Sequence, residues 1–252
     1  MAEGLAGRVA LVTGSGVGIG RACAIALAKA GAVIGVHYNR SVDAARETLD
    51  AVEEAGSRGY LLQGDISNET EANRIVDELT AQAGRLDVLF NNAGDPLRRS
   101  KLEDCPLELW KQALDINVTG AFLVTRRAIP HLRASGHGSI INNLSLSVQT
   151  GGAGGAGPYA AAKGALQVMT RTLSKELAPQ VRANAIMPGV VETRHHELFS
   201  TPERMEDYRK QTPLGRNSTA DEIAGAVVFL ASDASSFMTG ALLDLNGGRF
   251  LR

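Results

Sequence analysis

"RVALVTGSGVGIGRACAIALAKAG", residues 8–31, decides the fold of this 252-residue chain. Residues 8–14 form a short apolar run, which is typical of a strand buried on both faces. Residues 18–31 follow a helical pattern, and Gly31 stands where such a helix ends. A glycine-rich turn joins the two. The stretch therefore predicts a strand, a tight turn and a helix in direct succession.

The turn, "TGSGVGIG" at residues 13–20, presents backbone N–H groups and the positive end of the helix to a phosphate. Gly14 permits the tight turn, Gly18 lets a pyrophosphate approach, and Gly20 lets helix and strand pack closely. The spacing is Gly-x3-Gly-x-Gly rather than the commoner Gly-x-Gly-x2-Gly, and such a turn can also be purely structural. Its position favours dinucleotide binding, and the predicted contacts are Gly14, Ser15, Gly18, Ile19 and Gly20.

The rest of the chain continues the alternation of strand and helix. Further strands are expected at 32–38, 59–65, 86–94, 138–145, 181–189 and 240–248, and helices at 42–55, 68–83, 106–134, 158–178 and 219–232. The 106–134 helix is expected to break near Pro130. This alternation indicates a parallel sheet with right-handed crossovers. The predicted fold class is α/β: a single doubly wound Rossmann-type domain over residues 1–252, with a seven-stranded parallel sheet and helices on both faces.

The composition excludes several classes of protein. Lys and Arg total 26 against 27 Asp and Glu, so no net field recruits nucleic acid or an anionic membrane. No apolar run approaches the length of a bilayer span, and the first residues lack a secretory pattern. Cys23 and Cys105 are the only cysteines and are interpreted as reduced thiols. We expect a soluble, cytoplasmic protein.

The end of the second strand bears on the choice of cofactor. A site that grips a free 2′-hydroxyl places a carboxylate about 20 residues after the glycine turn. "HYNRS" at residues 37–41 contains no acid there, and Arg40 could pair with a 2′-phosphate. Arg40 could also be an ordinary exposed arginine. The missing carboxylate carries more weight and favours NADP(H) over NAD(H), with Tyr38, Asn39 and Arg40 as predicted contacts.

A second motif, "GPYAAAKG" at residues 157–164, suggests chemistry. Tyr159 and Lys163 are four residues apart, so a helix would place both side chains on one face. A neighbouring cation favours the phenolate and lowers the pKa of a tyrosine, which would make the pair a tuned proton donor. Taken alone, the motif is more often a surface helix with a solvated lysine.

Several weak motifs then occur together in a specific order: "TGSGVGIG", "GDI" at 64–66, "NNAG" at 91–94, "DIN" at 115–117, Ser145, "YAAAK" and "PGVVET" at 188–193. Together they resemble the short-chain dehydrogenase/reductase family, and the resemblance runs from about residue 5 to residue 248. It implies that Tyr159 is the catalytic acid/base and that Lys163 tunes it and binds the nicotinamide ribose. Asn117 matches the residue that anchors a water leading to the lysine.

The resemblance also implies the remaining cofactor contacts. Asp65 and Ile66 correspond to adenine contacts, although Asp65 could instead cap the next helix. The "NNAG" stretch corresponds to a support for the sheet beside the ribose, although it could be only a turn. The segment after the sixth strand corresponds to the support of the nicotinamide ring. The implied contacts are Asp65, Ile66, Asn91, Ala93, Gly94, Tyr159, Lys163, Pro188, Gly189, Val191 and Thr193.

The catalytic serine departs from the commonest family pattern. The usual separation from the tyrosine is 13 positions, which falls here on Leu146. Ser145 is expected at the C-terminal end of the fifth strand, where the family places its serine. The glycines of the following loop can absorb the extra residue. Strand alternation would put Ser145 and Ser147 on the same side, but we favour Ser145 as the third catalytic residue.

The resemblance implies an NAD(P)-dependent oxidoreductase that transfers a hydride between nicotinamide C4 and a ketone or secondary alcohol. The chain most resembles 3-oxoacyl-carrier-protein reductases and sugar or polyol dehydrogenases. No His/Cys cluster has metal-ligand spacing, so no metal is expected. One alternative is a non-catalytic dinucleotide-sensing protein on the same fold. Another is a nucleotide-sugar epimerase or dehydratase, which would need a larger C-terminal substrate region.

The substrate itself is less constrained by the sequence. Residues 194–216 are expected to form a mobile lid. His195, His196, Phe199 and Arg209 in this lid, with Arg98 and Arg99, could meet an acidic or phosphorylated substrate, but we favour solvated loop residues. The helix at 158–178 is rich in small and apolar residues on more than one side, which predicts a subunit contact. Together with the resemblance, it predicts a homotetramer.

Overall fold

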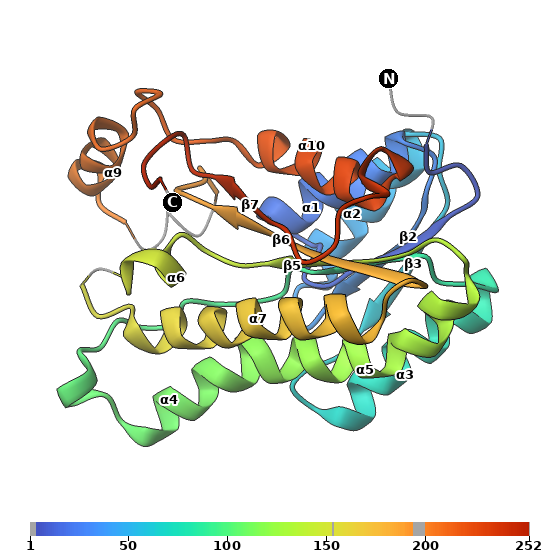
Figure 1. The fold of residues 1–252 in the computed structure, drawn as a ribbon, viewed down its shortest axis with the longest axis horizontal. Helices are drawn as coiled ribbons and strands as arrows, with labels where there is room; N and C mark the ends of the chain where they lie inside the picture. Colours follow the sequence, from blue (N-terminus) through green and yellow to red (C-terminus); the bar gives the residue numbers. More distant parts are fainter. Residues whose placement is uncertain (1–3, 153, 194–199, 252) are drawn as a thin grey trace.

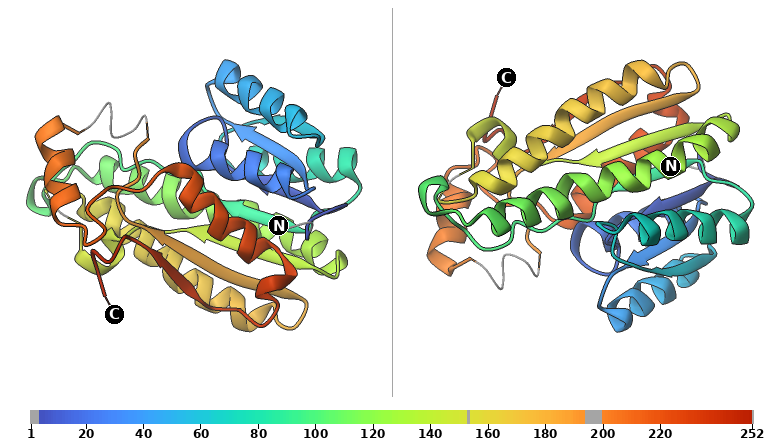
Figure 2. Two further views of the ribbon diagram at one scale, coloured as in Figure 1. Left: turned by 90° about the horizontal axis from the view of Figure 1, so that it is seen from above. Right: turned by 90° about the horizontal axis from the view of Figure 1, so that it is seen from below.

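In the computed structural model, which describes residues 4–152, 154–193 and 200–251, seven parallel strands form one sheet (Figures 1 and 2). The order across the sheet is β3-β2-β1-β4-β5-β6-β7, which confirms the predicted doubly wound topology. The strands are β1 (Val9–Val12), β2 (Val33–Tyr38), β3 (Gly59–Gln63), β4 (Val88–Asn91), β5 (Gly138–Asn143), β6 (Val181–Pro188) and β7 (Leu242–Leu245).

Helices cover both faces of the sheet. One face carries α1 (Gly18–Lys29), α2 (Val42–Glu54) and α10 (Ala220–Ala231). The opposite face carries α3 (Glu69–Ala83), α4 (Leu107–Leu114), α5 (Gly120–Ala134) and α7 (Gly157–Glu176), which lie together below the sheet in Figure 1. Shorter helices are α6 (Ser147–Thr150), α9 (Pro202–Lys210) and the 3-10 turns η1 (Leu102–Asp104) and η3 (Asp233–Ser235).

The central strand β1 shows why the sheet is buried. Successive side chains of a strand point to opposite faces. Ala10 and Val12 therefore pack against α1 and α10, whereas Val9 and Leu11 pack against the helices of the other face. All four residues are buried, as expected of a strand with helices on both sides.

The predicted break near Pro130 is wrong. Pro130 lies inside the continuous helix α5, although it cannot donate to the carbonyl four residues earlier. The buried residues Val124, Ala128 and Leu132 pack on either side of it and hold the helix together. The irregular turn lies earlier, in the π-helical segment η2 (Asp115–Thr119) between α4 and α5.

The carboxyl ends of the parallel strands point toward the same edge of the sheet. At this edge β4 ends at Asn91, β5 at Asn143 and β6 at Pro188, and the glycine turn follows β1. Ligands of open α/β sheets bind in the crevice at this edge. Among the described helices, none is long and apolar enough to cross a membrane.

Candidate active site

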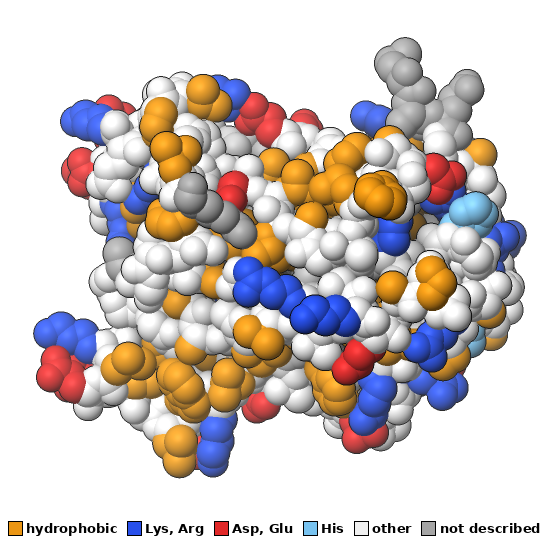
Figure 3. Space-filling model, viewed as in Figure 1, with side chains coloured by type: hydrophobic (Ala, Val, Ile, Leu, Met, Phe, Trp, Pro, Cys, Tyr) orange, Lys and Arg blue, Asp and Glu red, His pale blue; other side chains and the backbone are white. Residues whose placement is uncertain are grey.

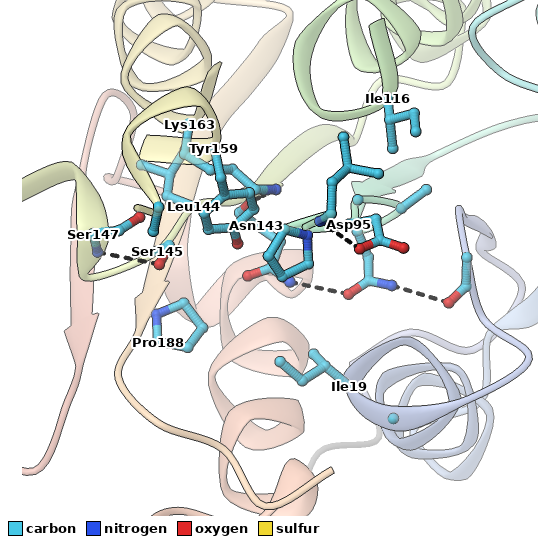
Figure 4. A pocket seen from close by; sticks show the side chains of 18 of the residues that line it. Ile19, Asp95, Ile116, Asn143, Leu144, Ser145, Ser147, Tyr159, Lys163 and Pro188 are labelled. Carbon is cyan, nitrogen blue, oxygen red and sulfur yellow. Dashed lines mark hydrogen bonds between the residues drawn. The ribbon is translucent and has the colours of Figure 1, made fainter. Parts of the chain in front are cut away.

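A large cavity lies at the carboxyl edge of the sheet, and most of the predicted site residues line it (Figure 4). Those that reach the cavity are Gly14, Gly18, Ile19, Gly20, Asn39, Arg40, Asp65, Ile66, Ala93, Gly94, Ser145, Tyr159, Lys163, Pro188, Gly189, Val191 and Thr193. The structure does not bring Ser15, Tyr38, Asn91 or Asn117 to the cavity wall.

Tyr159 and Lys163 lie one turn apart at the start of α7, as their spacing predicts. Pro158 stands in the first turn of this helix, where its missing N–H costs no hydrogen bond. Lys163 is 2% exposed, and its Nζ donates to the carbonyl oxygen of Asn143 over 2.7 Å. The same Nζ lies 5.7 Å from the centroid of the Tyr159 ring. The lysine therefore connects the helix to the end of β5 beneath the tyrosine.

The expected lowering of the pKa of Tyr159 is not seen. Burial raises the pKa of Tyr159 to about 12, a side-chain hydrogen bond with Ser145 acts against the rise, and the Asp95 carboxylate adds to it. Burial also lowers the pKa of Lys163 to about 8. The lysine ammonium is bonded to Asn143 and is not among the causes that shift the tyrosine. Tyr159 thus holds its proton firmly at neutral pH.

The structure places Ser145, rather than Ser147, beside the tyrosine. Hydrogen bonding by Ser145 acts to lower the pKa of Tyr159, and the Ser145 hydroxyl accepts from the backbone N–H of Ser147 over 3.1 Å. Ser147 begins α6, and its Oγ is buried without a hydrogen-bond partner among the described residues. Figure 4 shows Ser145 between Ser147 and Tyr159.

The strand register assumed for these serines was wrong. β5 ends at Asn143, two residues before Ser145, so strand alternation does not extend to either serine. Ser145 lies in the loop before α6 instead of at the end of the strand. This short helix turns the chain between Ser145 and the glycines that lead to α7. The extra residue is accommodated there.

Asn117 is completely buried in the π-helical turn η2 and holds the backbone after β4. Its Nδ2 donates to the carbonyl of Asp95 over 2.8 Å and to that of Ala113 over 3.0 Å. Its Oδ1 accepts from the N–H of Asp95 over 3.0 Å. A Cβ at Gly94 would lie 2.6 Å from this Oδ1 and 3.1 Å from Lys163 Nζ, so only glycine fits between them. Asn117 therefore adjoins Lys163 behind the wall of the cavity.

The glycine turn after β1 has the shape expected of a dinucleotide cradle. Gly14 and Gly18 have φ of 64° and 57°, in the left-handed region that favours glycine. A Cβ at Gly14 would lie 2.9 Å from Ala93 Cα, and one at Gly20 would collide with the Gly14 carbonyl. Ser15 points away from the cavity, and its N–H donates to the carbonyl of His37 over 2.9 Å.

His37 was missed as a site residue by the sequence analysis. It is 2% exposed, and its Nδ1 accepts from the N–H of Gly14 over 3.0 Å. Its Nε2, which then carries the ring proton, donates to the carbonyl of Gly64 over 3.0 Å. Burial lowers the pKa of His37 to about 4, so the ring is neutral. His37 therefore links the glycine turn to the residue that follows β3. The only signal for it in the sequence is a histidine within the otherwise apolar run of β2.

Asp65, a predicted cofactor contact, brings a carboxylate close to the end of β2. Asp65 follows β3, and hydrogen bonds from Ser67 lower its pKa, helped by a hydrogen bond from Asn39 and the charge of Arg40. Residues 37–41 themselves contain no acid, as the sequence shows. Asn39, Arg40 and Asp65 all line the cavity.

Asp95 is a second residue that the sequence analysis missed. Its Oδ1 accepts from the N–H of Leu97 over 2.7 Å, and Leu97 has a φ of 56°, which is rare for a residue with a side chain. Asp95 lines the cavity, and its charge reaches Tyr159. The tight turn thus holds a carboxylate whose charge acts on Tyr159.

The predicted substrate lid is only partly within the described residues. His195, His196 and Phe199 lie outside them. Arg209 lies on α9, where it pairs with Glu206 over 2.8 Å, and it does not line the cavity. Arg98 and Arg99 are exposed loop residues, as the favoured interpretation expects, and they also line the cavity.

Comparisons with known proteins show the family to which the chain is similar. The family model described as enoyl-(acyl carrier protein) reductase matches residues 14–249. The chain is 36% identical to the cis-4-hydroxycyclohexanecarboxylate dehydrogenase of Sinomonas cyclohexanicum, over 98% of each chain.

Two solved structures are also similar along the whole chain. The NADH-dependent reductase A1-R′ responsible for alginate metabolism is 36% identical, with a TM-score of 0.90 over 98% of this chain and 99% of that one. A gluconate 5-dehydrogenase from Burkholderia cenocepacia J2315, in complex with NADP and tartrate, is 34% identical, with a TM-score of 0.91 over 98% of this chain and 97% of that one.

Proposed function

The chain belongs to the short-chain dehydrogenase/reductase family of oxidoreductases, and we propose that it interconverts a ketone and a secondary alcohol with Tyr159 as the acid/base. The observation that carries the proposal is that Tyr159 and Ser145 line one cavity, where Ser145 acts to lower the pKa of the tyrosine, with Lys163 bonded beneath the ring to Asn143. Such a hydroxyl pair can bind one carbonyl oxygen from two sides. This property favours an enzyme over a protein that only senses a dinucleotide.

The glycine turn fits a nicotinamide dinucleotide. At Gly14 and Gly20 the backbone packs so closely that no Cβ would fit. Without side chains at these positions, a phosphate can approach the N–H groups at the start of α1. When bound, a nicotinamide cofactor supplies or accepts the hydride. The residues that would hold it are Gly14, Gly18, Ile19, Asn39, Arg40, Asp65, Ile66, Lys163, Pro188, Gly189, Val191 and Thr193.

The chain's own residues handle the proton and the substrate oxygen. With its pKa at about 12, the Tyr159 hydroxyl keeps its proton until negative charge develops on a carbonyl oxygen, and then donates it. Ser145 donates a hydrogen bond to the same oxygen, where an oxyanion-type donor is most effective. In alcohol oxidation Tyr159 accepts the proton instead, as the phenolate base.

For the cofactor we propose NADP(H) in preference to NAD(H). Arg40 lines the cavity at the end of β2, and β2 itself ends without an acid. Asp65 opposes this preference because its carboxylate shares the region with Arg40. The dissociation constants of NADPH and NADH decide the point, and binding of NADH at least as tightly as NADPH would contradict it. Tyr38→Asp should shift the preference toward NADH, since a carboxylate repels a 2′-phosphate.

A substrate panel tests the proposed reaction. Ketones should oxidise NADPH in the presence of the protein, and secondary alcohols should reduce NADP⁺ in the reverse direction. The panel includes oxo acids, because two of the relatives are named for the carboxylic acids cis-4-hydroxycyclohexanecarboxylate and gluconate. Saturable cofactor binding without turnover of any ketone or alcohol would favour the sensing protein.

We further propose that the protein is a homotetramer. On α7, Val168 is 61% exposed, Ala161 and Ala165 are exposed, and a Cβ at Gly164 would meet nothing within 4 Å. These residues form a stripe at helical spacing that faces away from the sheet. Hydrophobic side chains gather over α4 and α7 and again over α10 (Figure 3). Two separate apolar regions suit an assembly with two-fold symmetry.

A further inference from the structure

The ring of Tyr208, near the end of α9, lies between two arginines. The guanidinium carbon of Arg249 is 4.7 Å from the ring centroid, and that of Arg204 is 5.6 Å from it. Nε of Arg204 donates to the Tyr208 hydroxyl over 2.7 Å, and Nη2 of Arg249 donates to Oε1 of Gln211 over 2.7 Å. This group of side chains joins α9 to the C-terminal segment of the chain.

A tight turn fixes Arg249 in this position. Gly247 and Gly248, with φ of 65° and 83°, reverse the chain after β7. The N–H of Leu214 donates to the carbonyl of Gly247 over 3.2 Å, which fastens the turn to the segment that follows α9. Arg249 is therefore held against the last turn of α9 by its backbone as well as by its side chain.

Both arginines are partly buried, and within the described part of the chain neither has a counter-charge. Burial lowers the pKa of Arg249. Among the residues that the structure describes, neither Arg204 nor Arg249 has a carboxylate within 4.0 Å. Arg209 on the same helix is different, because it pairs with Glu206 over 2.8 Å. A desolvated cation without an anion is costly, so a site of this kind is expected to receive an anion from a ligand.

Arg249 lines the same cavity as Tyr159 and Ser145. Tyr208 and Gln211 also line it. Other cations that line the cavity include Arg98 and Arg99 from the loop after β4 and Lys111 from α4. The acids among the described residues that line it are Asp65, Asp95, Glu108 and Asp115, of which Glu108 is bonded to Lys111 over 3.2 Å.

We propose that Arg249, supported by Tyr208 and Gln211, binds a carboxylate of the substrate, so that the substrates are oxo and hydroxy carboxylic acids. The proposal rests on the proposed oxidoreductase function and names the substrate class of the same site. The planar guanidinium offers five N–H donors, and the described side chains accept from one of them. It can therefore bind a carboxylate in the two-pronged way that arginine favours.

The kinetic test compares an acid with its neutral ester. The probes are 4-oxocyclohexanecarboxylate and its methyl ester, with wild type, Arg249→Gln, Arg249→Lys and the control Lys210→Gln. Lys210→Gln removes one positive charge, as Arg249→Gln does. Lys210 is exposed on α9 and does not line the cavity, so this variant controls for the change in net charge. We expect Arg249→Gln to lose about tenfold to hundredfold in kcat/KM for the acid, the scale of a charged hydrogen bond, and little for the ester. Arg249→Lys should keep part of the preference for the acid.

A binding test separates this inference from the proposed reaction. Cyclohexanecarboxylate and cyclohexanecarboxamide are titrated into the complex with NADPH, so that no turnover is needed. Tighter binding of the carboxylate in wild type, lost in Arg249→Gln, supports the subsite even if no ketone is reduced, in which case only the proposed function fails. Equal binding of the two probes, or an equal loss for acid and ester, overturns the inference.

The anion could also be a phosphate of the cofactor. The dissociation constant of NADPH is therefore measured for Arg249→Gln and Lys210→Gln. An unchanged constant assigns the arginine to the substrate. A constant weakened tenfold or more in Arg249→Gln alone would assign it to the cofactor and overturn the proposal.

Discussion

Ser145 acts to lower the pKa of the Tyr159 hydroxyl, although Ser145 lies in a loop beyond the end of β5. Both residues line the cavity, Tyr159 from the start of α7 and Ser145 from the segment before α6, so both hydroxyls can meet a substrate oxygen there. Ser147, two residues later, shares the cavity but bonds to Ser145 only through its backbone N–H. The two serines therefore have different expected contributions to catalysis.

Ser145→Ala should reduce kcat by about 10²- to 10³-fold, the usual effect of removing a donor to a developing oxyanion. Ser147→Ala should reduce it much less, since its Oγ has no hydrogen-bond partner among the described residues. Steady-state kinetics of both variants on one ketone gives the comparison. The reverse ranking would mean that Ser147, not Ser145, contacts the substrate.

Asp95→Asn should move the alkaline limb of the pH profile. The Asp95 carboxylate raises the pKa of Tyr159, so its removal lowers that pKa. Ketone reduction needs the protonated tyrosine and should decline at a lower pH than in wild type, whereas alcohol oxidation should rise at a lower pH. The pH dependence of kcat/KM in both directions measures the shift. An unchanged limb would show that Asp95 does not influence the tyrosine in the working enzyme.

His37 should make the protein less stable in mild acid. Its pKa is 6.5 in an unfolded chain and about 4 in the fold, so the unfolded state binds the extra proton between these values. The free energy of unfolding is therefore unaffected by the titration of His37 above pH 6.5. It falls as the pH drops toward 4, by about 3 kcal/mol at most. Denaturant unfolding of wild type and His37→Asn across this range checks it, because asparagine does not titrate. Parallel curves for the two proteins would rule out His37 as the cause.

The same position also allows its two hydrogen bonds to be separated. In His37→Asn, Oδ1 can still accept from the N–H of Gly14, whereas in His37→Gln, Nε2 can still donate to the Gly64 carbonyl. If the bond to Gly14 holds the cofactor turn, His37→Asn should bind NADPH more tightly than His37→Gln. The opposite order would assign the main role to the contact with Gly64.

The proposed subunit contact predicts a loss of assembly. Val168 on α7 is 61% exposed, so a charge at this position would be buried in the interface. Val168→Glu should give smaller species in light scattering at micromolar concentration. Arg46→Glu, at an exposed site of α2 away from the apolar regions, serves as the control. A wild-type protein that is monomeric under these conditions would refute the tetramer.

The parts of the site that could be predicted from sequence depend on contacts close along the chain. The glycine turn follows directly from β1 and α1, and Tyr159 and Lys163 share a face because they are one helical turn apart. The parallel sheet followed from the alternation of strand and helix. Each of these features depends on residues close together in the sequence, so the sequence pattern was enough to predict it.

The features that were not predicted depend on packing between distant segments. His37 meets Gly14 and Gly64 only when three strands are assembled, and Asp65 reaches Arg40 from the next strand. The rise in the pKa of Tyr159 comes from burial and from Asp95, neither of which a spacing of four residues reveals. Pro130 is tolerated because α5 is packed on both sides of it.

The most direct test of the account is the turnover of Tyr159→Phe, measured together with its dissociation constant for NADPH. The account predicts that ketone reduction is abolished while cofactor binding stays close to wild type, because only the proton donor is removed. Lys163→Ala should impair both, since this lysine also lines the cofactor cavity. Near-wild-type turnover by Tyr159→Phe would contradict the assignment of Tyr159 as the catalytic acid/base.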